Sequence, residues 1–382
     1  MTTTGLRSLE VRSLIRPNGE LEVSVIESSV PAPGSDEVIV RVEASPVNPS
    51  DQGLMYGPAD LTSSRRAEVD GKSALVADVP AARLIALRAR VGIPLRAGNE
   101  GAGTVIAAGQ APAAQALLGK RVAVFAPGMY AQYRCVGADR CVVLPSSITT
   151  EQGAACFINP LTALGIVETV RLEGHRALVH TAAASNLGLM LARICAEDGI
   201  PLVGIVRGPQ QAARLANVGN ARVLDTSAAD FRPRLVDAIA DCGATIAFDA
   251  IGGGSQGGEI LAAMEQALQR SHSEYQHYGS PVVKQLYIYG SLDPSPTTIH
   301  RTFGLSFAIG GWLLWPFLQR IGTGRTRELQ DRVVAGLDST FRSDYAGHLS
   351  LQDLLDPDRM AKFMQRTTGG KFLLLPQRGH SD

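Results

Sequence analysis

Residues 178–188 combine an apolar strand pattern, a stretch of small residues and the start of a helical pattern. Small side chains let a backbone turn approach a pyrophosphate, and the first N–H groups of the following helix point at it. Of the G-x-G-x-x-G spacing typical of such turns, Gly188 is present, while Ala183 and Ser185 take the other two glycine positions. The segment therefore predicts a dinucleotide site; the alternative is an ordinary strand-to-helix turn of an α/β domain.

Apolar segments that alternate with helical patterns follow this turn. Strands are expected over 201–206, 221–225, 244–249 and 285–290, with a helix over 210–216 that ends at Gly219. Continuous apolar strands alternating with helices are typical of a doubly wound parallel sheet covered on both faces. Ligands of such sheets bind at the carboxyl ends of the strands, which is where the 182–188 turn lies.

Arg207 directly follows the expected strand 201–206. Dinucleotide folds specific for NAD place an acidic residue there to bind the ribose 2′-hydroxyl, whereas a cation accommodates a 2′-phosphate. No acidic residue occurs between Pro201 and Arg214, so the sequence favours NADPH as the cofactor. The alternative for Arg207 is a solvated surface arginine. Further along, Asp249 ends a strand before Gly252 and is expected to cap a turn near the cofactor.

The bulk composition limits the classes of function. A chain of 382 residues suggests two domains, and its 36 basic and 36 acidic residues give no reason to expect nucleic acid or an anionic membrane as a partner. Its five cysteines form no C-x-x-C pair and its N-terminus lacks a signal-peptide core, so we expect reduced thiols and a cytoplasmic location. The apolar segment 303–318 is too short to span a membrane and contains Pro316, so it is expected at a domain or subunit junction.

The first 150 residues have a different character. Short segments with alternating apolar and polar residues, separated by Gly/Pro turns, indicate an antiparallel, barrel-like domain that ends near residue 153. Residues 58–97 are interpreted as an insertion, which we expect to shape the substrate entrance. Within it, 78–92 predicts a helix with Asp78 as N-cap, Pro80 in the first turn and Gly92 at the end.

Six short motifs, taken in chain order, resemble those of one family. They are Val-Asn-Pro-Ser-Asp at 47–51, Gly-Asn-Glu-Gly-Ala-Gly at 98–103, Met-Tyr-Ala-Gln-Tyr at 129–133, Asn-Pro-Leu-Thr-Ala at 159–163, the 182–188 turn, and Gly-Gly-Trp-Leu at 310–313. They are similar to motifs of the zinc-free medium-chain dehydrogenase/reductases, the branch of quinone oxidoreductases and 2-enoyl thioester reductases. The resemblance implies a GroES-like β-barrel catalytic domain over 1–153 and 313–382, and a Rossmann NADP-binding domain over 154–312.

The resemblance also makes zinc a question, since many relatives are zinc alcohol dehydrogenases. Those enzymes carry a Cys in the turn that here contains Asn48, and a His where this chain has Asn99. A catalytic zinc needs about three Cys, His or carboxylate ligands, and a lone Glu100 does not hold it. We therefore expect no metal.

The function implied is NADPH-dependent reduction of quinones or of the C=C bond of α,β-unsaturated carbonyl compounds, by zinc-free hydride transfer to a small-molecule substrate. Two alternatives remain: a zinc-free alcohol dehydrogenase, and a non-catalytic NADPH-binding protein. The resemblance further implies a homodimer, formed through an edge strand near 309–314.

Candidate site residues follow from these motifs. Tyr56, just after the 47–51 motif, is the candidate proton donor, with packing as the alternative. Asn48 is expected at the nicotinamide ribose or as a turn-forming residue before Pro49, and Thr162 at the cofactor or as a helix cap. The full cofactor-binding set is Asn48, Thr162, Ala184, Ser185, Asn186, Leu187, Arg207, Gly252, Tyr289 and Gly290.

Overall fold

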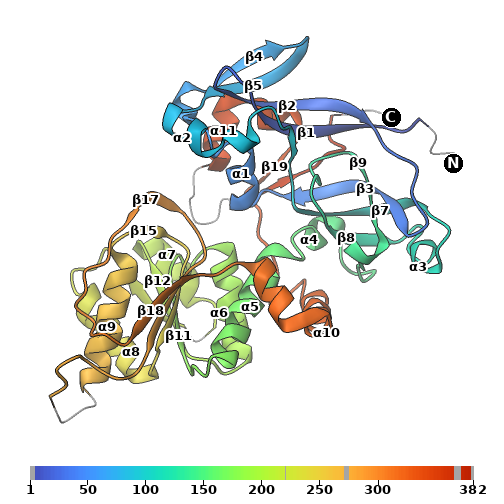
Figure 1. The fold of residues 1–382 in the computed structure, drawn as a ribbon. Helices are drawn as coiled ribbons and strands as arrows, with labels where there is room; N and C mark the ends of the chain where they lie inside the picture. The colour runs from blue at the N-terminus through green and yellow to red at the C-terminus, as the bar shows by residue number, and fades with distance from the viewer. Residues whose placement is uncertain (1–4, 220, 271–274, 365–370, 380–382) are drawn as a thin grey trace. The chain divides into compact units, whose positions relative to one another are not determined.

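The computed structural model describes residues 5–219, 221–270, 275–364 and 371–379 (Figure 1). The chain divides into two compact units, one formed by Met1–Phe157 with Arg342–Asp382 and the other by Ile158–Phe341. Each unit has its own sheets and core. Among the described residues, no helix is long and apolar enough to cross a membrane.

The second unit is built on a six-stranded parallel sheet. Its strands are β11 (Leu178–His180), β12 (Leu202–Val206), β13 (Arg222–Asp225), β14 (Ile246–Asp249), β16 (Lys284–Ile288) and β18 (Phe307–Gly311). Their spatial order is β13-β12-β11-β14-β16-β18, so the winding direction reverses between β11 and β14. The predicted doubly wound Rossmann sheet is confirmed, with its switch point beside the carboxyl end of β11. A separate parallel pair joins β15 (Gly252–Gly254) and β17 (Asp293–Thr297).

Helices cover both faces of this sheet. They are α5 (Ile158–Leu172), α6 (Asn186–Glu197), α7 (Pro209–Ala216), α8 (Phe231–Cys242), α9 (Gln256–Arg270) and α10 (Leu314–Ala335). In Figure 1, α8 and α9 lie on one face and α5 and α6 on the other. Every residue of β12 and β14 is buried, because strands covered on both faces need no polar alternation.

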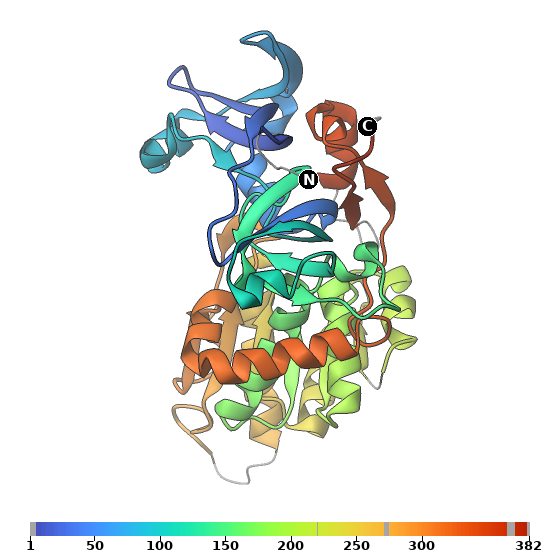
Figure 2. The same cartoon turned by 90° about the vertical axis from the view of Figure 1, so that its right-hand side faces the viewer.

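Helix α10 belongs to the second unit because it packs on α5, as Figure 2 shows. Trp312, just before α10, donates from Nε1 to Oγ1 of Thr169 at 3.0 Å, and Arg325 of α10 binds Glu168 of α5 at 3.0 Å. These contacts place 313–341 with the Rossmann unit, although the family resemblance implies a return of the chain to the catalytic domain at 313. The first boundary lies after Phe157 rather than near 153.

The first unit contains two sheets whose strand pairs are antiparallel, apart from β19–β20. One has the order β4-β5-β2-β1-β6, and the other the order β10-β8-β7-β3-β20-β19, with β9 also paired to β3. The expected antiparallel organisation is confirmed. The strands are β1 (Arg7–Ile15), β2 (Glu20–Ser29), β3 (Glu37–Pro46), β4 (Arg65–Val69), β5 (Lys72–Asp78), β6 (Leu95–Arg96), β7 (Glu100–Ala108), β8 (Arg121–Phe125), β9 (Tyr133–Gly137), β10 (Cys141–Val143), β19 (Gly347–Leu349) and β20 (Phe372–Leu374).

The C-terminal segment completes this unit. Strand β20 pairs with β3, and α11 (Pro357–Met364) is tied to α1 (Pro49–Met55) by a hydrogen bond of 2.9 Å from Nε2 of Gln52 to the carbonyl of Phe363. The short helices α3 (Pro112–Gln115) and α4 (Thr150–Gly153) lie earlier in the chain.

The helix predicted over 78–92 is wrong in extent. Asp78 is the last residue of β5, where it pairs with Glu20 of β2, and Pro80 takes the N-cap position. The helical part is limited to α2 (Ala81–Ala86) and a single turn at Arg88–Arg90. Pairing with β2 therefore extends the strand over the residues that were expected to start a helix.

Candidate functional site

The turn between β11 and α6 is held in a tight, capped conformation. Ser185 is the N-cap of α6, and its hydroxyl accepts a hydrogen bond from the Gly188 N–H at 3.1 Å. A Cβ on Gly188 would lie 2.3 Å from the carbonyl oxygen of Ala183, so the helix start approaches the strand end too closely for any side chain. Ala182 adopts a left-handed φ of 50°, an uncommon conformation for a residue other than glycine.

This turn has the groups that a dinucleotide pyrophosphate needs. Asn186 and Leu187 open α6, and the first N–H groups of a helix have no acceptor inside it. The side-chain nitrogen Nδ2 of Asn186 is buried and has no hydrogen-bond partner in the described part of the chain. Ala184 is 2% exposed and carries only a methyl group, which keeps the turn small. The residues therefore fit a bound pyrophosphate, with several donors still to be satisfied.

Asp249 organises the loop after β14, as expected. Its Oδ1 accepts hydrogen bonds from the Thr181 hydroxyl at 2.7 Å and from the Ile251 N–H at 2.9 Å, and Oδ2 accepts from the Gly252 N–H at 3.2 Å. Thr181 in turn accepts from the Ala250 N–H at 2.8 Å. The network ties the ends of β11 and β14 together. Gly252 has a φ of +80°, which suits the turn because glycine carries no Cβ.

Tyr289 follows β16 and reaches the end of β11. Its hydroxyl lies 2.7 Å from Nε2 of His180, and the two rings stack with centroids 5.8 Å apart. Burial lowers the pKa of His180 to about 3 and raises that of Tyr289, so both groups are neutral at physiological pH. The next residue, Gly290, is again a close-approach position, since a Cβ there would lie 2.4 Å from the carbonyl oxygen of Ala250.

Arg207 and Thr162 occupy different settings. Arg207 is exposed and directly follows β12, at the carboxyl edge of the sheet. Thr162 lies within α5, where its hydroxyl donates to the carbonyl of Ile158 at 2.6 Å. The structure thus brings the turn residues, Gly252, Tyr289, Gly290 and Arg207 to one edge of the sheet, whereas the Thr162 hydroxyl is engaged inside its own helix.

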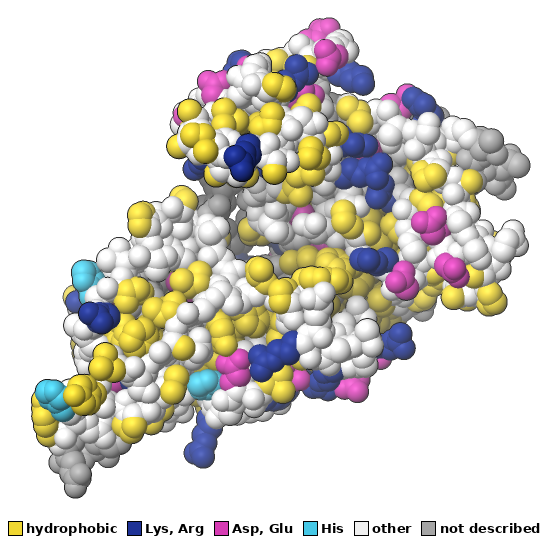
Figure 3. Space-filling model, viewed as in Figure 1, with side chains coloured by type: hydrophobic (Ala, Val, Ile, Leu, Met, Phe, Trp, Pro, Cys, Tyr) yellow, Lys and Arg dark blue, Asp and Glu magenta, His cyan; other side chains and the backbone are white. Residues whose placement is uncertain are grey.

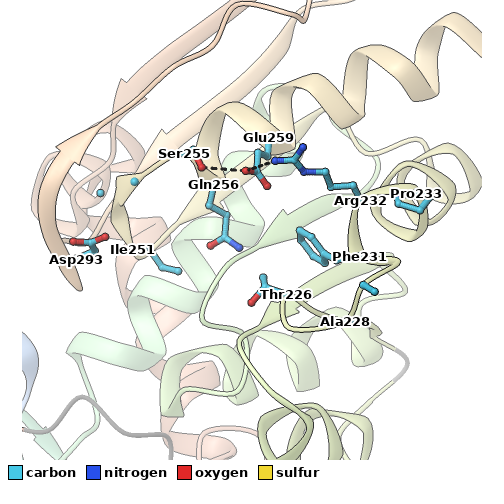
Figure 4. A pocket seen from close by; sticks show the side chains of 13 residues that line it. Thr226, Ala228, Phe231, Arg232, Pro233, Ile251, Ser255, Gln256, Glu259 and Asp293 are labelled. Carbon is cyan, nitrogen blue, oxygen red and sulfur yellow. Dashed lines mark hydrogen bonds and ion pairs between the residues drawn. The ribbon is translucent and has the colours of Figure 1, made fainter.

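A pocket of about 640 Å³ opens beside this edge, at the ends of β13 and β14 (Figure 4). Thr226 after β13 and Ile251 after β14 line it, together with the start of α8. Arg232 and Glu259 form an ion pair of 3.0 Å on its wall. None of the residues predicted from the sequence lines this pocket.

In the first unit, the 47–51 and 98–103 motifs meet in a buried polar cluster. Asn48 donates from Nδ2 to Oε1 of Glu100 at 2.8 Å, and Asn99 donates from Nδ2 to Oδ1 of Asp51 at 2.7 Å. Oε2 of Glu100 accepts from the Phe157 N–H at 2.9 Å. The Oδ1 atom of Asn48 remains buried without a partner in the described part of the chain, so Asn48 offers an acceptor to a ligand hydroxyl.

Burial governs the charges in this cluster. Burial raises the pKa of Asp51 to about 7. The hydrogen bond from the Asn48 N–H lowers this pKa, and the nearby charge of Glu100 raises it. Burial also disfavours the charged form of Lys371 and so lowers its pKa, whereas the negative charges of Glu100 and Asp51 raise this pKa. Within the described ranges, no three His, Cys, Asp or Glu side chains are grouped so as to hold a metal ion. The carboxylates instead serve as hydrogen-bond acceptors for the two asparagines.

Tyr56 lies in the core of the first unit. Its side chain is 0% exposed, its hydroxyl donates to the carbonyl of Leu354 at 2.7 Å, and its ring lies 6.0 Å from that of Phe363. Burial raises the pKa of its hydroxyl. A group enclosed in this way does not present a proton to a substrate, so we assign Tyr56 to packing, the alternative considered above.

Asp51, Glu100 and Lys371 are not among the site residues that the sequence predicts. Asp51 lies in the 47–51 motif and Glu100 in the 98–103 motif. The presence of a buried acid in each of these two motifs was the signal in the sequence that could have identified them. Lys371 comes more than 250 residues later in the chain, and no local pattern links it to them.

Comparisons with known proteins agree with this architecture. The family model described as "Alcohol dehydrogenase GroES-like domain" matches residues 34–146. Quinone oxidoreductase of Pseudomonas aeruginosa is 28% identical over 164 residues, which are 42% of this chain and 50% of that protein, so the match spans half the length of this relative. The mitochondrial enoyl-[acyl-carrier-protein] reductase of Xenopus tropicalis is 26% identical over 302 residues, 76% of this chain and 73% of that protein.

The fold is also that of a solved structure. The crystal structure of Escherichia coli quinone oxidoreductase complexed with NADPH superposes with a TM-score of 0.68 at 20% identity, covering 97% of this chain and all of that one. The chain therefore contains an alcohol dehydrogenase GroES-like domain, is similar in sequence to quinone oxidoreductases and enoyl reductases, and shares the fold of the Escherichia coli quinone oxidoreductase.

Proposed function

We propose that the protein is an NADPH-dependent oxidoreductase that reduces quinones or the C=C bond of α,β-unsaturated carbonyl compounds without zinc. The observation that carries the proposal is the β11–α6 turn, whose open N–H groups and buried Asn186 amide fit a dinucleotide. Support comes from relatives named quinone oxidoreductase and enoyl reductase, and from the NADPH in the Escherichia coli structure.

NADPH supplies the hydride, and the protein binds and orients the reactants. The N–H groups of Asn186 and Leu187 would hold the pyrophosphate, and Arg207 the 2′-phosphate. Asn48 would accept a hydrogen bond from the nicotinamide ribose at its unpartnered Oδ1. Because the Tyr56 hydroxyl is enclosed, we propose that water supplies the proton in place of this tyrosine.

The cofactor assignment is tested by Arg207→Gln. Charge-assisted hydrogen bonds contribute roughly 1.5 to 3 kcal/mol, which corresponds to about ten- to a hundredfold in affinity. Fluorescence titration should therefore show that Arg207→Gln weakens NADPH binding by this factor and leaves NADH binding unchanged. Arg214→Gln in α7 is the matched control, with the same charge change on an adjacent helix. Equal losses for both cofactors would overturn the assignment.

The reaction class is tested by NADPH consumption with a panel of quinones and enones. Turnover on this panel supports the proposal. Binding of NADPH without turnover on any member supports the non-catalytic alternative, and NADP-dependent oxidation of alcohols supports a zinc-free alcohol dehydrogenase.

We further propose a cytoplasmic homodimer that forms across β18. This strand ends the sheet and pairs with β16 alone among the described strands. Ile309 is 39% exposed and Leu313 67%, so an uncovered edge would be prone to aggregation. Light scattering should give a dimer for the wild type and a monomer for Ile309→Lys. Ile85→Lys, at an exposed site in the other unit, is the control that should stay dimeric.

A further inference from the structure

Two arginine side chains share one buried carboxylate in the first unit, and a third arginine lies near them. Arg12 of β1 and Arg96 of β6 stand directly opposite each other in the antiparallel pair. Nε of Arg12 donates to Oε1 of Glu10 at 2.7 Å, and Nε of Arg96 lies 3.4 Å from Oε2. Glu10 is 3% exposed, so this single acid is shared between two opposed cations. Like charges directly opposite each other in a sheet destabilise it unless they are compensated.

Arg134 of β9 adds a third positive charge. Its Nη2 donates to the carbonyl of Pro127 at 3.0 Å, whereas its Nε is buried and has no hydrogen-bond partner in the described part of the chain. No acidic side chain of the described residues lies within ion-pair distance of Arg134. Burial, followed by the charge of Arg96, lowers the pKa of its guanidinium. In Figure 3, basic side chains gather over β1 and β9.

The turn at Pro127 and Gly128 keeps these cations together. Gly128 has a φ of +86°, and a Cβ there would lie 3.1 Å from Cβ of Arg96 and 3.2 Å from Cζ of Arg134. The backbone therefore packs against both side chains at once. Arg96 and Arg134 are held on one side of the barrel despite their repulsion.

The net charge of the arginine cluster favours a ligand with a charge of about −2. Three guanidinium groups and one carboxylate leave a net charge of about +2, which a phosphate monoester with about −1.5 to −2 at pH 7 neutralises. Planar guanidinium groups also match phosphate oxygens in two-point hydrogen bonds. We propose that Arg12, Arg96 and Arg134 form a binding site for a phosphate monoester. This site is separate from Arg207, which lies in the Rossmann unit, and it does not depend on the proposed function.

Calorimetric titration with inorganic phosphate at low ionic strength and pH 8 tests the site, using the full chain with Arg207→Gln so that the expected cofactor phosphate site is removed. Arg134→Gln and Arg96→Gln should each weaken phosphate binding by about ten- to a hundredfold. Glu10→Gln should strengthen it, because the net charge of the cluster rises. Arg7→Gln is the matched control, since Arg7 lies on the same strand but pairs with Glu27 at 2.9 Å.

Unchanged phosphate affinity in both arginine variants, or no measurable phosphate binding, would overturn the proposal. Acetate at the same ionic strength should bind far more weakly, and equal binding would show a general anion site in place of a phosphate site. Circular dichroism checks the fold of each variant. If Arg134→Gln does not fold, Arg96→Gln decides the question, because its side chain is 44% exposed and its loss leaves little buried space.

Discussion

Asn99 donates a hydrogen bond from Nδ2 to Oδ1 of Asp51 over 2.7 Å, inside the GroES-like unit. Asp51 is 0% exposed, and its second oxygen accepts from the Asn48 N–H at 3.1 Å. The acid and the amide therefore join the 47–51 motif to the 98–103 motif inside this unit.

The free energy of unfolding should depend on pH through Asp51. Burial raises the pKa of Asp51 from 3.8 to about 7, so the folded state binds its proton more tightly than the unfolded state does. The resulting stabilisation is present below pH 4 and is lost as the pH rises through 7, by up to about 4 kcal/mol. Denaturant unfolding of Asp51→Asn should lack this dependence. Asp70→Asn, at an exposed turn, should keep the wild-type profile, and a wild-type profile in Asp51→Asn would contradict the prediction.

Gly188→Ala should disturb the β11–α6 turn. Its Cβ would lie 2.3 Å from the Ala183 carbonyl oxygen, and the next two nearest atoms are also Ala183 backbone, so no flexible side chain is there to move away. Thermal unfolding should show a loss of about 1 to 3 kcal/mol, together with weaker NADPH binding. Gly324→Ala is the control, because its Cβ meets nothing within 4 Å and α10 gains helix propensity there. Equal changes in stability and NADPH binding for Gly188→Ala and Gly324→Ala would contradict the prediction that the close approach at Gly188 excludes a side chain.

The buried ion pair of Lys284 and Glu265 should be sensitive to the loss of one partner. Nζ lies 2.5 Å from Oε2, and the two side chains are 0% and 2% exposed. Lys284→Met leaves the carboxylate buried without its cation and should cost about 3 to 5 kcal/mol of unfolding free energy, measured by denaturant titration. The double variant Lys284→Met with Glu265→Leu should recover much of the loss. A double variant no more stable than the single one would argue against the prediction.

The Lys284–Glu265 ion pair should stop stabilising the folded state at acidic pH. Burial raises the pKa of Glu265, but hydrogen bonds from Lys284, the Ser280 N–H and Gln269 outweigh it, so the pKa lies below its usual 4.5. The stabilisation from this carboxylate is therefore present above pH 4.5 and is lost as the pH falls through the folded-state pKa. Glu265→Gln should flatten the acid limb of the stability curve.

Tyr56→Phe separates packing from proton donation. The change removes the hydrogen bond to Leu354 and leaves a buried carbonyl without it, so stability should fall by about 1 to 2 kcal/mol. The value of kcat with the preferred enone should stay within about twofold of the wild type. A hundredfold fall in kcat at unchanged stability would restore Tyr56 as the proton donor.

The sequence predicts the elements of the Rossmann unit well because their apolar runs are continuous. The expected strand 201–206 corresponds to β12, Leu202–Val206, and the segment 285–290 overlaps β16, Lys284–Ile288. Strand β17 has two prolines in five residues and no apolar pattern, so it was not foreseen. Its pairing with β15 depends on the loop that Asp249 shapes.

Contacts between distant segments account for the remaining differences. Tyr56 is enclosed by Leu354 and Phe363, about 300 residues further along the chain, and nothing near Tyr56 in the sequence reports this. The Arg12, Arg96 and Arg134 cluster likewise draws on three separate strands. Local periodicity places each residue in its strand, but the meeting of the strands in space follows from the barrel as a whole.

The division of the chain also sets an order of events during synthesis. The Rossmann unit is one continuous segment, so all of its residues are synthesised before residues 342–382 of the GroES-like unit. The GroES-like unit contains the earlier residues but lacks β20 and the Leu354 and Phe363 cover of Tyr56 until then. The GroES-like unit is thus begun first and completed last. Until β20 is synthesised, its apolar core is incompletely covered, and exposed apolar surface of this kind binds chaperones.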